Sequence, residues 1–382
     1  MATHTIRVSA AGDDAFIDPS ATFETGPLAV HTTLLSNGRR EGVKLVELTA
    51  GDTRVVVLPD RGLGIWKMVA GGVELGWQSP VKGPVHPSFV PLAEPSGLGW
   101  LDGFDELVAR CGLVSNGAPE FDAHGRLVHG LHGRIANLPA HDVAVTLDDD
   151  AGTVTLTGAV DETRFLCHAL RLETTLVLEA NRHRITWTDK VTNLSNRPAT
   201  MQMLYHVNLG PPMLGAGAEL VAAIEELAPR DLNAASDVAS WNRYAGPQPG
   251  HAEQVHFARL RPDANGKATA MLVAPDRLHG AVVSWRADTL PWFTLWKNLG
   301  GERDGYVTGI EPGTNFPNTR SFEESQRRVV PLAPGESVCF ELAIDVVSGD
   351  RFALVRREID ALASASRPVM HPNPRSGWSS GA

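Results

Sequence analysis

The sequence predicts a mainly β protein, built as one large antiparallel β-sandwich with a few short helices. Two observations favour this fold. Apolar and polar residues alternate over long stretches from about residue 141 onward, and such alternation gives a strand one buried and one wet face, as antiparallel sheets require. The chain also has 382 residues, of which 43% are hydrophobic, so it can fill one large core.

The N-terminal quarter is expected to hold short strands and a long loop. Residues 1–26 are polar and contain Gly and Asp, so we expect a loosely packed lead-in with room for one edge strand. Residues 43–58 predict two short strands around a Gly-Asp turn. Residues 80–99 are rich in Pro, Gly and Ser, which predicts a long loop, and loops of this length are often functional.

A short amphipathic helix is expected to begin near Trp100. Apolar residues recur there at spacings of three and four, which would place them on one helix face, and Gly112 would end the helix. The apolar positions are Leu101, Phe104, Leu107, Val108 and Cys111.

The strand pattern fills most of the rest of the chain. Residues 222–250 interrupt it as an irregular insertion. A second amphipathic helix is predicted for residues 350–362, and the Pro-, Ser- and Gly-rich residues after Ser364 predict a disordered tail. The alternating segments are residues 153–160, 170–179, 185–191, 268–273, 281–285, 292–296 and 338–346.

The domain organisation follows from these elements. No internal repeat and no clean linker divides the chain. We therefore expect a lead-in over residues 1–26, a single catalytic β-sandwich domain over 27–363 with two sheets packed face to face, and a tail over 364–382.

The composition narrows the classes of partner. A formal net charge of -10 leaves no basic footprint for nucleic acid or an anionic membrane surface. The N-terminus lacks the apolar segment of a signal peptide and no run is long enough to span a bilayer, so we expect a cytoplasmic protein. Three scattered cysteines indicate reduced thiols. The expected partner is a small molecule, and the sequence leaves open whether the chain is a monomer or a dimer.

Three polar stretches interrupt the strand pattern and are candidates for the functional site. They are residues 128–134, with two histidines beside glycines, residues 203–210, and residues 306–322. In the third, Pro312 and Gly313 should end a strand just after Glu311, because Pro cannot donate to a sheet ladder. That position would suit a general base, and it would equally suit a plain strand end.

Other residues in and near these stretches also have two interpretations. The histidines at 124, 129 and 132 could bind a metal, but no known metal-ligand spacing supports this. Trp292 and Trp296 lie on one face of a strand, where they would either pack in the core or form a platform for a sugar ring. Lys297 could bind sugar hydroxyls or an anionic substituent.

Taken together, the motifs resemble those of the aldose 1-epimerase (galactose mutarotase-like) family. The sequence is most similar to an uncharacterised bacterial branch of aldose-1-epimerase-like proteins, over most of residues 40–347. The motifs that carry the resemblance are L-P-D-R-G-L-G-I (58–65), W-Q-S-P (77–80), G-W-L-D-G-F (99–104), R-C-G-L (110–113), L-H-G-R (131–134), Y-H-V-N-L-G (205–210) and I-E-P-G-T-N (310–315).

The resemblance implies a set of site residues. Glu311 matches the general base, His206 the general acid, and His132 a histidine that hydrogen-bonds the sugar near its ring oxygen. Asn208 and Trp296 would also contact the sugar. The family has an arginine in its site, and Arg61, Arg110 and Arg134 are all candidates for it.

One motif departs from the family. Typical mutarotases carry N-H-x-Y-F-N-L, whereas this chain has M-L-Y-H-V-N-L, with the histidine two positions before the asparagine. An offset of two residues keeps a side chain on the same face of a strand, so His206 can still reach the pocket.

The chemistry of anomer interconversion needs few groups. Opening a pyranose removes a proton from the anomeric hydroxyl and adds one to the ring oxygen, which one carboxylate and one imidazole can do together without a metal or another cofactor. Two other hypotheses remain. The same pair could abstract a carbon-bound proton, as in a keto-sugar epimerase or lyase, or the chain could bind carbohydrate without catalysis.

Overall fold

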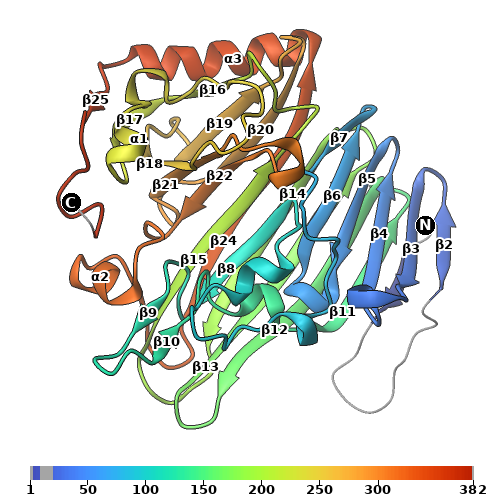
Figure 1. Ribbon diagram of the computed structural model, residues 1–382. Coiled ribbons are helices and arrows are strands. Elements are labelled where there is room, and N and C mark those ends of the chain that lie inside the picture. The colour runs from blue at the N-terminus through green and yellow to red at the C-terminus, as the bar shows by residue number, and fades with distance from the viewer. Residues whose placement is uncertain (1–2, 9–19, 381–382) are drawn as a thin grey trace.

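The structure, a computed structural model, describes residues 3–8 and 20–380. Residues 1–2 and 9–19 of the expected lead-in and residues 381–382 of the expected tail lie outside the described part. The prediction of a mainly β protein is confirmed: two large, almost entirely antiparallel sheets pack against each other (Figure 1). No helix in the described residues is both long and apolar enough to cross a membrane.

The first sheet has nine strands in the described residues. It contains the long hairpins of the central alternating segments, whose buried positions follow the predicted two-residue period. In spatial order the strands are β1 (Thr3–Arg7), β11 (His141–Asp148), β12 (Thr153–Arg164), β13 (His168–Glu179), β14 (Arg184–Asn193), β24 (Ser337–Ser348), β20 (His279–Arg286), β19 (Lys267–Val273) and β16 (Glu219–Ala222).

The second sheet has fourteen strands in the same part of the chain. Its path runs through β2 (Thr22–Thr25), β3 (Leu28–Leu34), β4 (Lys44–Ala50), β5 (Thr53–Leu58), β6 (Gly64–Ala70), β8 (Val108–Leu113), β15 (Ala199–Leu209), β22 (Val307–Gly313), β21 (Trp292–Asn298), β18 (Gln254–Leu260), β17 (Ile224–Pro229) and β25 (Val369–Met370). Off this path, β7 (Val73–Leu75) pairs with β6 and β23 (Val330–Leu332) with β15. A separate hairpin joins β9 (Glu120–Phe121) to β10 (Leu127–His129).

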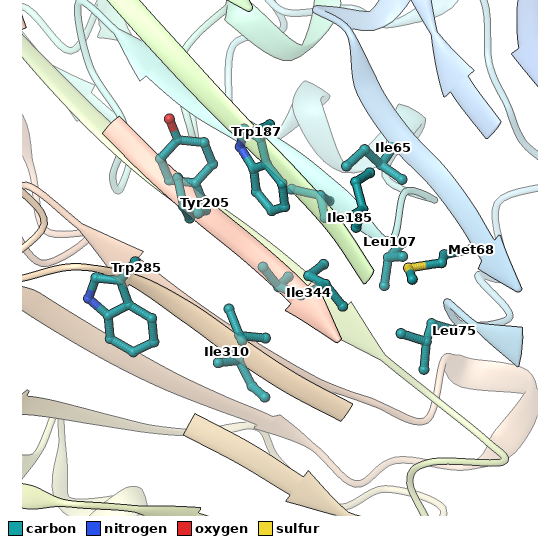
Figure 2. Close-up of a cluster of buried hydrophobic side chains, with 14 of the residues drawn as sticks. Ile65, Met68, Leu75, Leu107, Ile185, Trp187, Tyr205, Trp285, Ile310 and Ile344 are labelled. Carbon is teal, nitrogen blue, oxygen red and sulfur yellow. The ribbon is translucent and has the colours of Figure 1, made fainter. Parts of the chain in front are cut away.

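The main hydrophobic core lies between the two sheets. Figure 2 shows part of it, with Tyr205 of β15 and Ile310 of β22 beside Trp187 and Ile344 of the first sheet. Successive strand residues point to opposite faces. His206 and Glu311, the residues that follow Tyr205 and Ile310, therefore lie on the other face of the second sheet, which loops cover.

Three helices are present in the described residues. The predicted C-terminal helix is confirmed as α3 (Gly349–Ser364), which covers the outer face of the first sheet and buries Val355 and Ile359 there. Short helices α1 (Leu232–Ala235) and α2 (Arg320–Ser325) flank the second sheet (Figure 1). The predicted irregular insertion 222–250 contains α1 but begins with strand β17.

The helix predicted near Trp100 is wrong. Residues Gly99–Gly103 form a single 3₁₀ turn, and the chain then enters β8, in which all six residues are buried. A strand that is buried on both faces shows no two-residue alternation. Its apolar residues matched the helical spacing by coincidence.

The disordered tail predicted after Ser364 is not what the structure shows for its described part. β25 pairs in parallel with β17, and Trp378 is buried against Phe316 and Trp292. The prediction of disorder rested on the Pro, Ser and Gly content of the tail, which gives no information on these few anchoring contacts. The lead-in likewise contributes two described strands, β1 and β2, rather than one.

Candidate active site

Glu311 and His206 face each other on neighbouring strands at the centre of the second sheet. The register pairs Leu204 with Gly313 and Val207 with Ile310, which places His206 directly opposite Glu311. The Nε2 atom of His206 lies 3.2 Å from Oε1 of Glu311, and their side chains are 6% and 2% exposed. Strand pairing thus brings together two residues that are 105 positions apart in the sequence.

A glycine makes room for this contact. Gly309 lies two residues before Glu311 on the same face of β22, and a Cβ atom there would be 2.3 Å from Oε1 of Glu311 and 3.1 Å from Cε1 of His206. No side chain other than hydrogen fits this position without moving the carboxyl group. The strand itself ends at Gly313 rather than just after Glu311 as predicted.

Asn208 fixes the orientation and the tautomer of His206. The amide Nδ2 of Asn208 donates to the carbonyl oxygens of Glu106 and His206, both at 3.0 Å. Its Oδ1 therefore faces Nδ1 of His206 at 2.6 Å as an acceptor, so Nδ1 carries the proton that makes this bond. In the neutral ring, Nε2 then carries no proton, and its lone pair points at Glu311.

The oxygen of Glu311 that faces His206 is Oε1. Among the described residues, this atom is buried without a hydrogen-bond partner. Burial, followed by the charge of Glu253, raises the pKa of Glu311 well above its ordinary value. Burial and then the neighbouring His132 lower the pKa of His206 well below its ordinary value. Both shifts favour an uncharged pair, in which a single proton placed between Oε1 and Nε2 would satisfy both atoms.

His132 completes the polar part of the site. Its ring meets that of His206 edge-on, with 5.4 Å between the ring centroids, and its Nδ1 donates to the carbonyl oxygen of Asn116 at 3.0 Å. Loss of surrounding water lowers the pKa of His132 to about 4, so the ring is neutral near pH 7. Asn116 in turn exchanges two amide hydrogen bonds, of 2.9 and 2.8 Å, with Asn315 beyond the Glu311 strand.

Aromatic rings form the wall around the two histidines. Trp296 and Phe104 lie 5.3 and 5.0 Å from the His206 ring, and Trp100 lies 4.7 Å from the His132 ring. Trp296 is only partly buried, and its Nε1 donates to the exposed Glu253 at 2.7 Å. Trp296 therefore lies beside His206 at the edge of the candidate site, where a role as a sugar platform stays a prediction.

Trp292 has the other of the two roles that the sequence left open. It packs with Phe316 and Trp378, away from the two histidines. Trp292 and Trp296 share a face of β21, and Trp292 is the one whose ring meets Trp378 of the tail.

Three cationic residues predicted to contact the sugar have their charged groups occupied elsewhere. Arg61 is buried in an ion pair with Glu106 and also donates to Asn137 and two carbonyl oxygens. Arg110 faces the core and holds Asp189 through two bonds of 2.6 and 3.1 Å. Lys297 lies on the face of β21 opposite to Trp296, in an ion pair with Asp237. The charged groups of all three are thus bonded to protein partners and are not open to a ligand at Glu311.

The remaining predicted residues lie apart from Glu311 and His206. Arg134 lines a different cavity, together with His129. His124 is exposed in the turn between β9 and β10. Within residues 3–8 and 20–380, no group of three His, Cys, Asp or Glu side chains is placed to hold a metal ion, so the three histidines do not gather as a metal site would require.

Sequence reasoning missed part of the site. The apolar spacing in the sequence places Trp100 and Phe104 in a helix rather than in a ligand site. No sequence pattern singles out Glu253, which bonds Trp296 at the rim of the site. The density of aromatic residues in G-W-L-D-G-F, next to a Pro- and Gly-rich loop, was a signal for a ligand-facing segment.

Solved structures share this fold. A candidate aldose 1-epimerase from Klebsiella pneumoniae superimposes with a TM-score of 0.94 at 29% identity, over 98% of this chain and 100% of that one. A galactose mutarotase-like protein from Clostridium acetobutylicum gives a TM-score of 0.57 at 16% identity, over 85% of this chain and 99% of that one. A galactose 1-epimerase from Lactobacillus acidophilus gives 0.53 at 14% identity, over 84% and 99%. At such low identity, the last two likenesses show the fold alone.

These comparisons confirm the predicted resemblance in fold to galactose mutarotase-like proteins. A comparison with curated protein sequences finds no match. One family model covers most of the chain, from residue 40 to residue 346, including Glu311, His206 and His132. The chain therefore belongs to the family described as Domain of unknown function (DUF4432).

Proposed function

We propose that the protein is a carbohydrate isomerase that interconverts the anomers of an aldose or a modified sugar by acid–base ring opening. The observation that carries this proposal is the contact between Glu311 and His206. It places an open carboxyl group 3.2 Å from a histidine nitrogen whose tautomer is fixed, in surroundings lined by aromatic rings. General acid–base catalysis needs two such groups within hydrogen-bond reach of the reacting atoms.

The geometry suits the two oxygens of the anomeric centre. The ring oxygen and the anomeric hydroxyl are bonded to the same carbon atom, so an acid and a base that touch each other can each face one of them. One group accepts the hydroxyl proton while the other gives a proton to the ring oxygen, and the ring bond to the anomeric carbon breaks. Reclosure on the other face of the aldehyde returns both protons and yields the other anomer.

The proton count of the pair fits this cycle. The unliganded pair holds one proton between Oε1 and Nε2, so it always offers one donor and one acceptor. Transfer of that proton from Glu311 to Nε2 gives the carboxylate base and imidazolium acid that the resemblance implies. Ring opening takes up one proton and releases one, so the pair emerges ready for closure without exchange with water.

Other residues would orient the sugar. Trp296 offers an indole face at the rim, and sugars stack on such faces through their C–H groups. His132, with Nδ1 bonded to Asn116, presents Nε2 as a hydrogen-bond acceptor for a hydroxyl. Asn208 acts through His206 and is a positioning residue.

The test is an exchange experiment in heavy water. Wild-type protein is mixed with a panel of neutral and acidic aldoses, and the rate of exchange between anomers is measured by NMR. We expect at least one aldose to exchange faster than in buffer, with no deuterium incorporated at carbon. The proposal fails if the protein accelerates no aldose in the panel.

The same experiment separates the two other hypotheses. Deuterium at a carbon next to the carbonyl would indicate a keto-sugar epimerase or lyase, because anomer exchange moves only hydroxyl protons. Saturable sugar binding without any exchange, unaltered in Glu311→Gln, would indicate a carbohydrate-binding protein.

A further inference from the structure

A cavity of about 540 Å³ lies beside the segment that carries His132. We call it the arginine cavity. Glu311, His206 and His132 do not line it. Its walls come from the β10 segment, from the residues just after β8, from residues 92–93 and from the tip of the β12–β13 hairpin. The residues with polar side chains in its lining are Ser115, His129, Arg134, Glu162, Arg164, Cys167 and His168.

Two of these residues are arginines, and the charge of Arg134 acts on the carboxyl group of Glu162 in the same lining. Arg134 and Arg164 are exposed, and within the described part of the chain the side chain of neither forms an ion pair or a hydrogen bond. Arg61 and Arg110, in contrast, are fully bonded inside the protein. Burial lowers the pKa of His168, and the charges of Arg134, Arg164 and Arg320 lower it further, although Arg320 itself is bonded to Val114 and Thr200. The charges of the three arginines therefore converge on this cavity.

Two residues of the lining carry polar atoms that are not hydrogen-bonded within the described residues. The Oγ atom of Ser115, in a residue that is only 2% exposed, is buried without a hydrogen-bond partner in the described residues, and so is Nε2 of His168. Buried polar atoms without partners cost stability unless a ligand or water satisfies them. Both atoms belong to the lining of the cavity and can donate a hydrogen bond when suitably protonated.

One carboxyl group also belongs to the lining. Oε2 of Glu162 accepts hydrogen bonds from the backbone N–H groups of Leu113 and Val114, at 2.6 and 3.3 Å. That oxygen is thus turned toward the backbone of β8. Glu162 offsets one of the positive charges when ionised and leaves an excess of positive charge around the cavity.

We propose that the arginine cavity binds the anionic group, a phosphate or a carboxylate, of a small ligand. Arg134 and Arg164 would hold its oxygens through charge-assisted hydrogen bonds. A single guanidinium group can donate two such bonds to one carboxylate or phosphate. The hydroxyl of Ser115 would donate a further hydrogen bond. Nothing in this inference depends on the proposed anomer exchange.

The position of the cavity suggests two sources for the anion. Gly130 and Gly133 line it, and they flank His132, whose other side meets His206. The anionic group is carried either by the sugar that enters the candidate active site or by a separate molecule that binds only here.

The native cysteines allow a direct test. Cys167 lines the cavity and is exposed, Cys339 is exposed on β24, and Cys111 is buried. Alkylation by iodoacetamide is followed by mass spectrometry with inorganic phosphate added up to about 10 mM, a range that reveals millimolar affinity, at constant ionic strength. We expect phosphate to slow labelling of Cys167 about tenfold and to leave Cys339 unchanged. Equal rates at Cys167 with and without phosphate would overturn the proposal.

Variants show whether the arginines are responsible. Arg134→Ala combined with Arg164→Ala should abolish the protection, whereas Arg351→Ala, at an exposed arginine of α3, should preserve it. If the double alanine variant unfolds, Arg134→Gln combined with Arg164→Gln removes the charges and keeps most of the volume. Protection that survives in every correctly folded double variant would also overturn the proposal.

The source of the anion is identified by competition. A hexose 6-phosphate and a hexuronate are titrated with and without an excess of a neutral aldose that the protein turns over. Competition by the neutral aldose indicates one ligand spanning both sites. Independent binding indicates a separate ligand, and this result stands even if Glu311 proves not to be catalytic.

Discussion

Two buried acid–base contacts lie back to back on the two faces of β15, and they are built differently. On the core face, both oxygens of Asp189 are fully used: Oδ1 accepts from Arg110 and Thr174, and Oδ2 from Arg110 and Tyr205. On the outer face, Oε1 of Glu311 lies 3.2 Å from Nε2 of His206 and forms no hydrogen bond in the described residues.

The difference teaches how to tell a structural charge from one available for chemistry. A buried carboxylate that holds an arginine and two hydroxyls has no position left for a ligand, and removing it leaves its partners unsatisfied. A buried carboxyl group with open lone pairs is costly to the fold, and such costs are tolerated mainly where a ligand will use the group. The following predictions test this comparison.

The largest effect is expected at Asp189. Asp189→Asn leaves Arg110 buried without its counter-charge, which should lower the free energy of unfolding by about 3 to 5 kcal/mol. Urea denaturation measures this change. Glu311→Gln makes the same chemical change on the outer face and serves as the matched control, with an expected loss below about 1 kcal/mol. Equal losses in the two variants would refute the distinction between them.

A smaller effect is expected at Gly309. In Gly309→Ala the new Cβ would lie 2.3 Å from Oε1 of Glu311, so the carboxyl group must turn away from His206. A displacement of this kind should reduce the rate of anomer exchange about 100-fold, with only a modest change in stability. The control is Gly246→Ala, where a Cβ meets only Ala216 at 3.6 Å and the rate should not change. A Gly309→Ala variant with full activity would show that the contact is not needed.

Glu162 is intermediate between the two contacts, because it accepts two backbone hydrogen bonds but forms no ion pair in the described residues. Burial raises its pKa to about 7. A raised carboxyl pKa adds stability below the unfolded value of 4.5, and that stability is lost as the pH rises through 7. Between pH 5 and pH 8, wild type should therefore lose more stability than Glu162→Gln, by on the order of 2 kcal/mol.

Thermal or urea unfolding at both pH values, in buffer without phosphate, measures this difference. Asp105 has a pKa of about 7, also raised chiefly by burial, and it contributes equally to both proteins. Parallel pH profiles for wild type and variant would contradict the assignment to Glu162.

Much of the fold follows from local sequence pattern. The central hairpins show regular alternation because one face packs in the core and the other meets water, and α3 shows a helical stripe for the same reason. β8 has no such signal because both of its faces are buried. The packing of the tail depends on Trp378 and on a strand pair with β17, which are contacts that no local pattern reveals.

The candidate site divides in the same way. Glu311, His206 and His132 were identified because a strand end, a proline corner and glycine-flanked histidines are visible in the sequence, together with the family resemblance. The arginines could not be separated, because their partners are remote: Arg61 is paired with Glu106 and Arg110 with Asp189, 45 and 79 residues away. Whether an arginine faces the core or the candidate site therefore cannot be predicted without knowing these distant partners.

The central claim is that the open pair of Glu311 and His206 performs acid–base chemistry on a sugar. The most direct measurement is the rate of anomer exchange in Glu311→Gln, on the aldose that wild type turns over best, together with the melting temperature of the variant. The amide cannot take up or release the shared proton, so we predict a rate lower by about 100-fold or more, with a stability loss below about 1 kcal/mol. A folded variant that exchanges anomers at the wild-type rate would contradict the account.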